Sequence, residues 1–233
     1  MNFTAGDDTT YNHVLLINKP LTWTSFDVVN KLRYTISKKV GQRIKVGHAG
    51  TLDPLATGLL IICTGKMTKQ IDDFTGMDKE YSGTFFMGAT TPTYDSEMEP
   101  DAFFSIENID ENLVREIAAQ KFIGVLQQMP PIYSAIKIEG KTAYAQARKG
   151  KEVEMKLRTV EIKEFEITRI ELPEIDFRVV CSKGTYIRSL AFDFGKALNS
   201  GAYLKALCRT KIGGFDLKKS LTVEECVNKI SSL

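Results

Sequence analysis

The sequence has few of the residues that bind structural metals or form disulfide frameworks. Its 233 residues include two histidines and four cysteines. The cysteines are scattered along the chain as Cys63, Cys181, Cys208 and Cys226, and none of them forms a Cys-x-x-Cys pair. Scattered cysteines argue against both a disulfide framework and a zinc site. We therefore expect no bound metal and a cytoplasmic protein.

Long apolar runs and targeting segments are absent too. The longest uninterrupted apolar runs are far too short to cross a bilayer. Residues 1–12 are polar and include Asp7 and Asp8, so they resemble neither a signal peptide nor a transit peptide. We expect a flexible N-terminus and no association with a membrane.

Most of the common catalytic signatures are missing as well. The glycine-rich stretch 47–58 lacks the Gly-Lys-Ser/Thr ending of a P-loop, and no G-x-G-x-x-G follows a predicted strand. The sequence also lacks a G-x-S-x-G elbow and an H-E-x-x-H motif. These absences exclude the usual nucleotide-binding, serine-hydrolase and zinc-protease sites.

The composition is that of an ordinary globular protein, but its charge is unevenly distributed. Hydrophobic residues make up 43% of the chain and charged residues 26%, with a net charge of +2. Residues 31–45 carry six cations and no acid, whereas residues 92–116 carry eight acids and only Arg115. A second basic stretch covers residues 183–219. The two basic stretches indicate a positively charged face that could bind a polyanion. The alternative is that their charges are only exposed to solvent.

Hydrophobic periodicity predicts a mixture of strands and helices. Val14–Ile17 reads as a strand, and Thr24 or Ser25 offers an N-cap for a helix through about Ile36. Further strands are predicted at 59–63, 81–87, 132–138, 157–172, 177–181 and 204–215, and further helices at 67–74, 112–120, 142–148, 186–198 and 221–230. Residues 92–109 read mostly as loop. The helix at 186–198 is expected to be capped by Ser182 or Thr185.

This order of elements lacks the regular alternation of strand and helix that builds a parallel sheet. It favours an α+β fold with a mixed, mostly antiparallel sheet flanked by helices. We found no internal repeat and no linker, so a single catalytic domain over residues 1–233 is the simplest count.

One loop is more informative than any other part of the chain. Residues 47–60 place His48 and a single acid, Asp53, in a turn rich in glycine, and the buried strand at 59–63 follows at once. A loop that holds a carboxylate beside a core strand is a common way to build a catalytic site. The alternative is an ordinary turn, because Asp-Pro is frequent in turns for conformational reasons alone.

The partners that such a carboxylate would need are also present. An arginine beside Asp53 would lower the carboxyl pKa by ~1–3 units and could pair with it in a bidentate fork. Arg188 lies at the start of a predicted helix, and taken alone it reads more readily as an arginine on the surface of that helix. Tyr81 and Tyr186 could stack on a nucleobase, or they could be half-buried strand residues. His48 reads as a hydrogen-bonding loop residue rather than a titrating catalyst.

On these residues the chain resembles the TruB family of bacterial tRNA pseudouridine synthases. The resemblance runs from about Val14 to the C-terminus. Its motifs are Leu15–Pro20, Gly47–Leu60, Lys79–Tyr81, Pro131–Lys137 with Gly140, and Cys181–Arg188. The string Gly-His-Ala-Gly-Thr-Leu-Asp-Pro-Leu-Ala-Thr-Gly at 47–58 is highly specific, and Ser-Lys-Gly-Thr-Tyr-Ile-Arg at 182–188 is nearly so.

The resemblance implies the pseudouridine synthase fold and an isomerase that converts the T-loop uridine of tRNA, conventionally numbered 55, to pseudouridine. It implies base flipping, no cofactor and Asp53 as the catalytic aspartate. The resemblance assigns the following further roles: Arg188 pairs with Asp53; Tyr186 contacts the base and serves in proton transfer; Tyr81 stacks on the base; His48 fills the space that the flipped uridine leaves; Leu207 lines the pocket; and Lys19 belongs to the substrate-binding set.

The resemblance also bears on partners. It implies that a mobile loop over about residues 127–154 contacts RNA, that the T-arm stem-loop of tRNA is the partner, and that no protein partner is needed, so we expect a monomer. The chain departs from the family at Thr91-Pro92-Thr93, where Thr-Asp-Thr is usual, and at Met98, where glycine is usual. The stretch after Ser220 has room for one helix and not for the C-terminal PUA module of many relatives, so we expect a short form that relies more on the T-arm.

Three alternatives remain at this point. The chain could be a pseudouridine synthase for another RNA uridine, or an RNA-binding or RNA-folding protein whose catalysis is dispensable. It could also be an N-glycosidase that uses Asp53 with water and releases free uracil.

Overall fold

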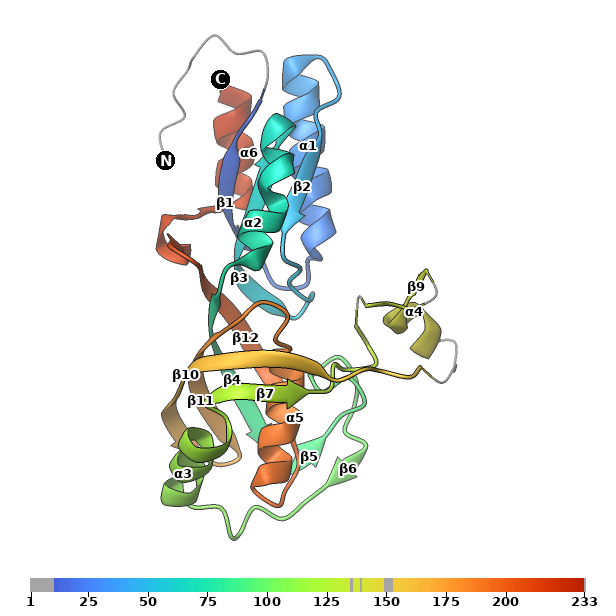
Figure 1. Cartoon of the computed structure of the whole chain (residues 1–233). Coiled ribbons are helices and arrows are strands. Elements are labelled where there is room, and N and C mark those ends of the chain that lie inside the picture. Colours follow the sequence, from blue (N-terminus) through green and yellow to red (C-terminus); the bar gives the residue numbers. More distant parts are fainter. Residues whose placement is uncertain (1–10, 135, 139, 149–152, 233) are drawn as a thin grey trace. The chain divides into compact units, whose positions relative to one another are not determined.

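The structure of the chain is a computed structural model that describes residues 11–134, 136–138, 140–148 and 153–232 (Figure 1). The chain forms two compact units, one comprising Met1–Tyr81 with Cys208–Leu233 and the other Ser82–Leu207. Strands β4 (Lys79–Met87) and β12 (Ala202–Ile212) carry the chain from one unit to the other. The count of one catalytic domain stays a prediction.

The first unit is built on strands that pair mostly antiparallel. β1 (Val14–Lys19) lies antiparallel to β3 (Ala56–Thr64), and β2 (Val46–Ala49) also pairs antiparallel with β3. The short β14 (Leu221–Thr222) runs parallel to β1 on its other side. In strand order this gives β14-β1-β3-β12, and β13 (Phe215–Asp216) pairs with β12.

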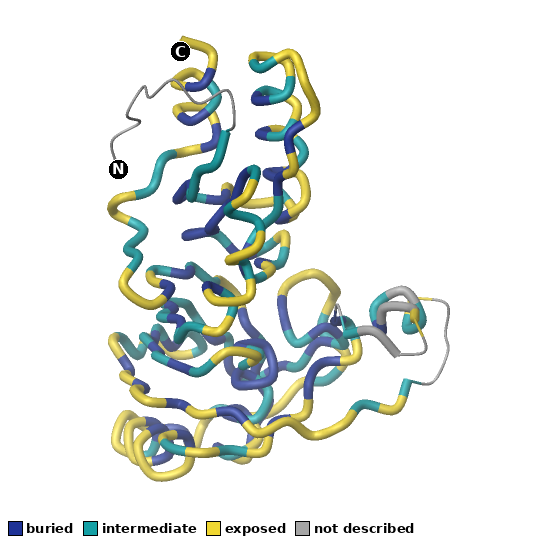
Figure 2. The backbone as a smooth tube through the Cα atoms, turned by 45° about the horizontal axis from the view of Figure 1, so that its top comes forward, coloured by how far each residue is buried: buried dark blue, intermediate teal, exposed yellow. Residues whose placement is uncertain are grey.

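Helices cover both faces of this sheet. On one face, α1 (Ser25–Val40) and α6 (Val223–Ser232) share a core with Leu15, Ile17, Leu60 and Ile62. On the other face, the 3-10 helix η1 (Gly65–Gln70) and α2 (Ile71–Gly76) cover a core that contains Leu16, Leu59, Ile61, Cys63 and Phe74. Because successive residues of β3 point to opposite faces and both faces are covered, its apolar run is continuous rather than alternating. Figure 2 shows this buried centre as dark blue trace.

Helix α1 begins and ends where its sequence provides caps. The Thr24 side chain accepts from the amide of Asp27, and the Asp27 carboxylate accepts from the amide of Thr24, which is a capping box. Gly41 ends the helix with φ 74°, a left-handed conformation that favours glycine. The helix therefore runs four residues beyond the predicted end at Ile36.

The second unit has a sheet with one solvated face. Its strand order is β12-β4-β11-β10-β7. β10 (Arg158–Glu171) pairs antiparallel with β7 (Gly124–Gln128) on one side and with β11 (Glu174–Cys181) on the other. The other helices and strands of this unit are α3 (Glu111–Lys121), α4 (Ala143–Ala147), α5 (Ile187–Ala197), β5 (Ala89–Thr90), β6 (Ala102–Phe103), β8 (Lys137–Ile138) and β9 (Lys141–Thr142). The core between the sheet, α3 and α5 is aromatic and contains Phe85, Phe122, Phe165, Phe177 and Phe194.

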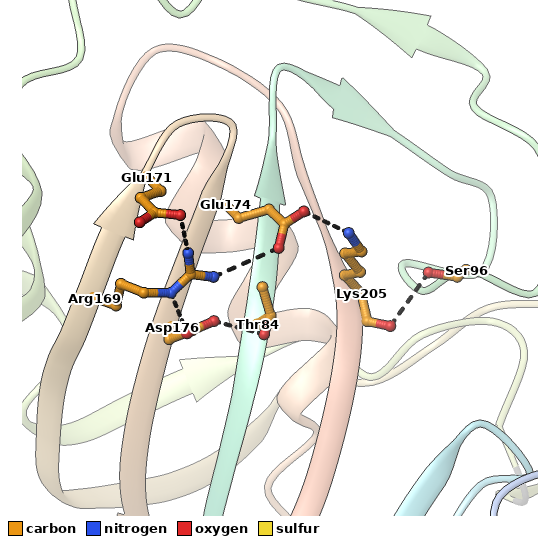
Figure 3. A network of polar contacts seen from close by, with 7 residues as sticks. All are labelled: Thr84, Ser96, Arg169, Glu171, Glu174, Asp176 and Lys205. Carbon is orange, nitrogen blue, oxygen red and sulfur yellow. Dashed lines mark hydrogen bonds and ion pairs between the residues drawn. The ribbon is translucent and has the colours of Figure 1, made fainter.

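The outer face of this sheet carries a network of charges (Figure 3). Arg169 contacts Glu171, lies 2.7 Å from Asp176 and lies 3.6 Å from Glu174. Glu174 pairs in turn with Lys205 on β12. Exposed pairs of this kind contribute ~0–1 kcal/mol each, so they explain the alternating charge along β10 rather than the stability of the unit.

The predicted α+β fold with a mixed, mostly antiparallel sheet is confirmed, but some local predictions were wrong. Residues 132–138 do not form an extended strand, because the chain bends after Pro131 and only β8 is extended. Helix α5 begins at Ile187 with Tyr186 as its N-cap and without a side-chain cap, so neither Ser182 nor Thr185 caps it. The Thr185 hydroxyl instead donates to the carbonyl of Ser182. In the described part of the chain, no helix is long and apolar enough to span a membrane.

Asp193 on α5 should make stability depend on pH. Burial raises the pKa of its carboxyl from 3.8 to about 6, against the opposing charge of Lys196. A carboxyl whose pKa is higher in the folded than in the unfolded protein favours the folded state at low pH. This contribution is complete below the pKa of the unfolded state and is lost as the pH rises through the pKa of the folded state. Asp193→Asn should therefore gain stability relative to wild type between pH 4 and 7, by up to about 3 kcal/mol. Urea unfolding at several pH values checks this, and parallel curves for the two proteins would contradict it.

Candidate functional site

The loop that carries Asp53 is shorter than the sequence indicated. It occupies residues 50–55, because β3 begins at Ala56 rather than at Leu59. His48 lies in strand β2 opposite Ile62 and not in the loop, which corrects its predicted placement. The Ala56 amide donates to the Asp53 carbonyl at 3.0 Å and closes the turn. Asp53 itself is partly buried.

Helix α1 holds the loop on one side of Asp53. The Ser25 hydroxyl accepts from the amide of Leu52 at 2.8 Å and lies 3.1 Å from the carbonyl of the same residue. Both Ser25 and the Leu52 side chain are buried. The backbone of the residue before Asp53 is therefore tied to the first turn of α1.

The end of β1 holds the loop on the other side. The amide of Thr22 donates to the Pro54 carbonyl at 2.8 Å, and the Lys19 ammonium lies 3.5 Å from the same oxygen. Lys19 also donates to the carbonyls of Trp23 at 2.6 Å and Pro20 at 3.0 Å, and its side chain is fully buried. The structure thus places Lys19 beneath the loop, and its predicted contact with substrate stays a prediction.

The electrostatics of this unit lower the pKa of two bases beside the loop, Lys19 and His48. Burial lowers the pKa of Lys19 to about 8, with the Asp53 carboxylate opposing the shift and Arg209 adding to it. Burial also lowers the pKa of His48, and the Arg209 charge acts in the same direction. An imidazole with a lowered pKa is neutral at neutral pH, which suits a residue that fills space rather than one that carries a proton.

In the second unit, the end of β7 fixes the segment that contains Tyr186. Gln128 is buried and bonds the Tyr186 backbone twice, since its amide nitrogen donates to the carbonyl at 3.1 Å and its oxygen accepts from the amide at 2.8 Å. One turn later, the Ser189 hydroxyl donates to the Met129 carbonyl at 2.7 Å. The start of α5 is therefore rigidly attached to the strand end.

Arg188 has partners within its own unit. Its Nε lies 3.6 Å from Asp95 Oδ2, and its Nη1 donates to the Thr93 carbonyl at 3.2 Å. Arg188 and Asp95 are each only 6% exposed. Tyr94, which lies between Thr93 and Asp95 in the sequence, has φ 62°, and its ring centroid lies 4.2 Å from that of Phe192 in a stacked arrangement. The segment 91–95, where the sequence departs from the family pattern, is thus the segment that receives Arg188.

The predicted site residues are divided between the two units. Lys19, His48, Asp53 and Tyr81 belong to the first unit, whereas Tyr186, Arg188 and Leu207 belong to the second. Tyr81 is buried in β4 at 8% exposure, and Leu207 is half-buried in β12. The pairing of Arg188 with Asp53 stays a prediction.

Sequence reasoning missed several residues that support these positions. Asp95 and Gln128 lie far in sequence from the residues they hold, so no local pattern identifies them. Ser25 was considered only as an N-cap, a role that Thr24 fills. Charge alone does not identify Arg209 either, because β12 also carries Lys205 and Lys211. Within the described ranges, no group of three or more His, Cys, Asp or Glu side chains could hold a metal ion.

A known protein family matches more than half of the chain. Residues 37–187 match the profile described as TruB family pseudouridylate synthase, N-terminal domain. The chain belongs to the TruB family. This membership confirms the resemblance that the motifs indicated.

Relatives of this family are similar over almost the whole chain. A protein of Flavobacterium johnsoniae named tRNA pseudouridine synthase B is 60% identical over 212 residues, which cover 90% of this chain and 92% of the relative. A protein of the same name from Phocaeicola vulgatus is 56% identical over 225 residues, covering 96% and 93%.

A solved structure of a Cbf5-Nop10-Gar1 complex contains a similar chain, with a TM-score of 0.72 and 27% identity. The match covers 94% of this chain and 54% of that one, so this chain spans about half of its length. The fold described above is therefore that of a pseudouridine synthase.

The buried Arg188–Asp95 pair generates a prediction about stability. Asp95→Ala should reduce the free energy of unfolding by about 3–5 kcal/mol, because it leaves the Arg188 charge buried without this partner. Glu97→Ala serves as the control, since Glu97 pairs with the exposed Arg148 at 3.1 Å and should change stability by less than about 1 kcal/mol. Urea unfolding measures both variants. Equal losses in the two would contradict the importance of the buried pair.

Proposed function

We propose that this chain converts uridine to pseudouridine in the T-loop of tRNA, at the position numbered 55, with Asp53 as the catalytic residue. The observation that carries the proposal is the loop 50–55. Its backbone is held on both sides of Asp53 by Ser25 and Lys19, while Asp53 itself is only partly buried. A carboxylate on a fixed backbone suits chemistry that depends on accurate placement, where an error of 1 Å costs ~10²-fold in rate.

The proposed reaction is an isomerisation and needs no cofactor. The bond between N1 of uracil and C1′ of ribose breaks, the uracil turns over, and a bond forms between C5 and C1′. The proton on C5 is released to solvent, and N1 gains a proton. Asp53 attacks the sugar, attacks the base or removes a sugar proton, and all three routes give this balance.

The other site residues serve to hold the uridine outside the RNA stack. Flipping a nucleotide out of a folded loop costs a few kcal/mol. Stacking on Tyr81 offsets that cost by ~1–3 kcal/mol, and neutral His48 occupies the vacated space. Tyr186 contacts the base from the start of α5 and takes part in proton transfer, Leu207 lines the pocket, and Arg188 pairs with Asp53.

The RNA partner is the T-arm stem-loop of tRNA. Positive charge in and near the segment 127–154 would contact phosphates, and part of this segment lies outside the described residues. In the described part, the Arg148 guanidinium lies 4.8 Å from the centre of the Tyr144 ring. We propose that the protein acts as a cytoplasmic monomer.

Asp53→Asn should abolish the reaction without abolishing binding. The substrate is a T-arm stem-loop transcript that carries tritium at C5 of uridine, so that each turnover releases tritium to water. The variant should lose at least about a thousandfold in rate, because the carboxylate itself performs the chemistry. Its affinity for the RNA should stay within a few-fold of wild type.

The matched control is Asp72→Asn, which makes the same change of charge at an exposed position on α2 in the same unit. This variant should retain the wild-type rate. Activity in Asp53→Asn would show that the catalytic assignment is wrong, and free uracil in the wild-type reaction would favour an N-glycosidase. Modification of full tRNA with an untouched stem-loop would contradict the T-arm as a sufficient partner.

A further inference from the structure

Arg209 on β12 is one of the most buried large side chains of the protein. Only 1% of it is exposed, although it carries a guanidinium that is charged at any ordinary pH. Burying a charge is costly unless the group is hydrogen-bonded. The contacts that compensate this cost therefore show what the side chain does.

The hydrogen bonds of Arg209 go to main-chain carbonyls on both sides of the Asp53 loop. Its Nη2 donates to the Gly50 carbonyl at 3.0 Å, and its Nη1 lies 3.4 Å from the Thr51 carbonyl. Its Nε donates to the Leu59 carbonyl on β3 at 2.8 Å. One planar group thus joins the start of the loop to the strand that follows it.

The backbone of Arg209 is also pressed against this strand. Gly58 has φ 104°, and a Cβ atom at Gly58 would lie 2.4 Å from the Arg209 carbonyl oxygen. The two strands therefore approach as closely as glycine permits. Main chain and side chain of Arg209 consequently hold the same short stretch of β3.

Arg209 adds two residues to those of the loop that are held by buried polar side chains. Ser25 holds Leu52, and Lys19 lies at the Pro54 carbonyl. Arg209 supplies the contacts to Gly50 and Thr51, which neither of the others reaches. A lysine at position 209 would offer a single ammonium in place of the rigid fork of donors that spans these carbonyls.

We propose that Arg209 is a positioning residue, which sets the place of the Asp53 carboxylate by fixing the loop backbone on its N-terminal side. This inference rests on the proposed role of Asp53 in catalysis. Because Arg209 acts through the backbone, its loss should lower kcat while leaving the affinity for RNA largely unchanged.

The test compares Arg209→Met and Arg209→Lys with wild type on the T-arm stem-loop. Arg209→Met should lose about a hundredfold in kcat, with KM changed by less than about threefold. Arg209→Lys should recover part of that loss, because one carbonyl bond can still form. Amide hydrogen exchange at Leu52, whose amide bonds Ser25, should accelerate in both variants and more strongly in the methionine variant.

The control is Ile230→Ala, a fully buried change on α6 in the same unit and away from the loop. It should lower the melting temperature while kcat stays within about twofold of wild type. If Arg209→Met does not fold, the proposal is tested on Arg209→Lys alone, by its kcat and by the rate of amide hydrogen exchange at Leu52.

Wild-type kcat in the folded Arg209 variants would overturn the proposal, as would an equal loss of kcat in Ile230→Ala. Unchanged exchange at Leu52 would overturn it as well. Catalytic activity in Asp53→Asn would contradict the proposed function. The amide exchange at Leu52 would still show whether Arg209 holds the loop, because that measurement does not depend on catalysis.

Discussion

The loop 50–55 depends on buried polar side chains that bond its main chain. A loop of this length between two antiparallel strands leaves its carbonyls without partners from the sheet. In this protein, Lys19, Ser25 and Arg209 reach those groups from β1, α1 and β12. Two of the three are cations, and bonds from charged donors are worth ~1.5–3 kcal/mol each, more than neutral ones. The position of Asp53 thus follows from charges placed in the core rather than from the turn sequence alone.

The same charges shape the chemistry of their surroundings. Burial, together with the charge of Arg209, lowers the pKa of Lys19, while the carboxylate of Asp53 acts in the opposite direction. His48 is kept neutral by burial and by Arg209. A site of this kind contains one acid, a neutral imidazole and cations whose donors are already bonded to carbonyls. Such a site is suited to a reaction that uses one carboxylate.

The elements that could be predicted from sequence were those whose signal is local. The apolar run 59–63 indicated a buried strand because both faces of the first sheet are covered, and Thr24 with Asp27 marked the start of α1. The strand predicted at residues 132–138 was wrong, because an apolar composition does not distinguish a strand from a bent segment that follows two prolines. The supports of the site could not be predicted, because Arg209 bonds carbonyls about 150 positions away and Asp95 meets Arg188 only in the folded unit. The motifs predicted candidate site residues, which stay predictions, and the structure shows what holds several of them in place.

The most direct test of the central claim is to map pseudouridine across the total RNA of a strain that lacks this protein, with and without restoration of the wild-type gene. The account predicts that pseudouridine disappears from the T-loop position of tRNA and returns on restoration. An intact T-loop pseudouridine in the deletion strain, with loss at a different RNA site or at none, would contradict it.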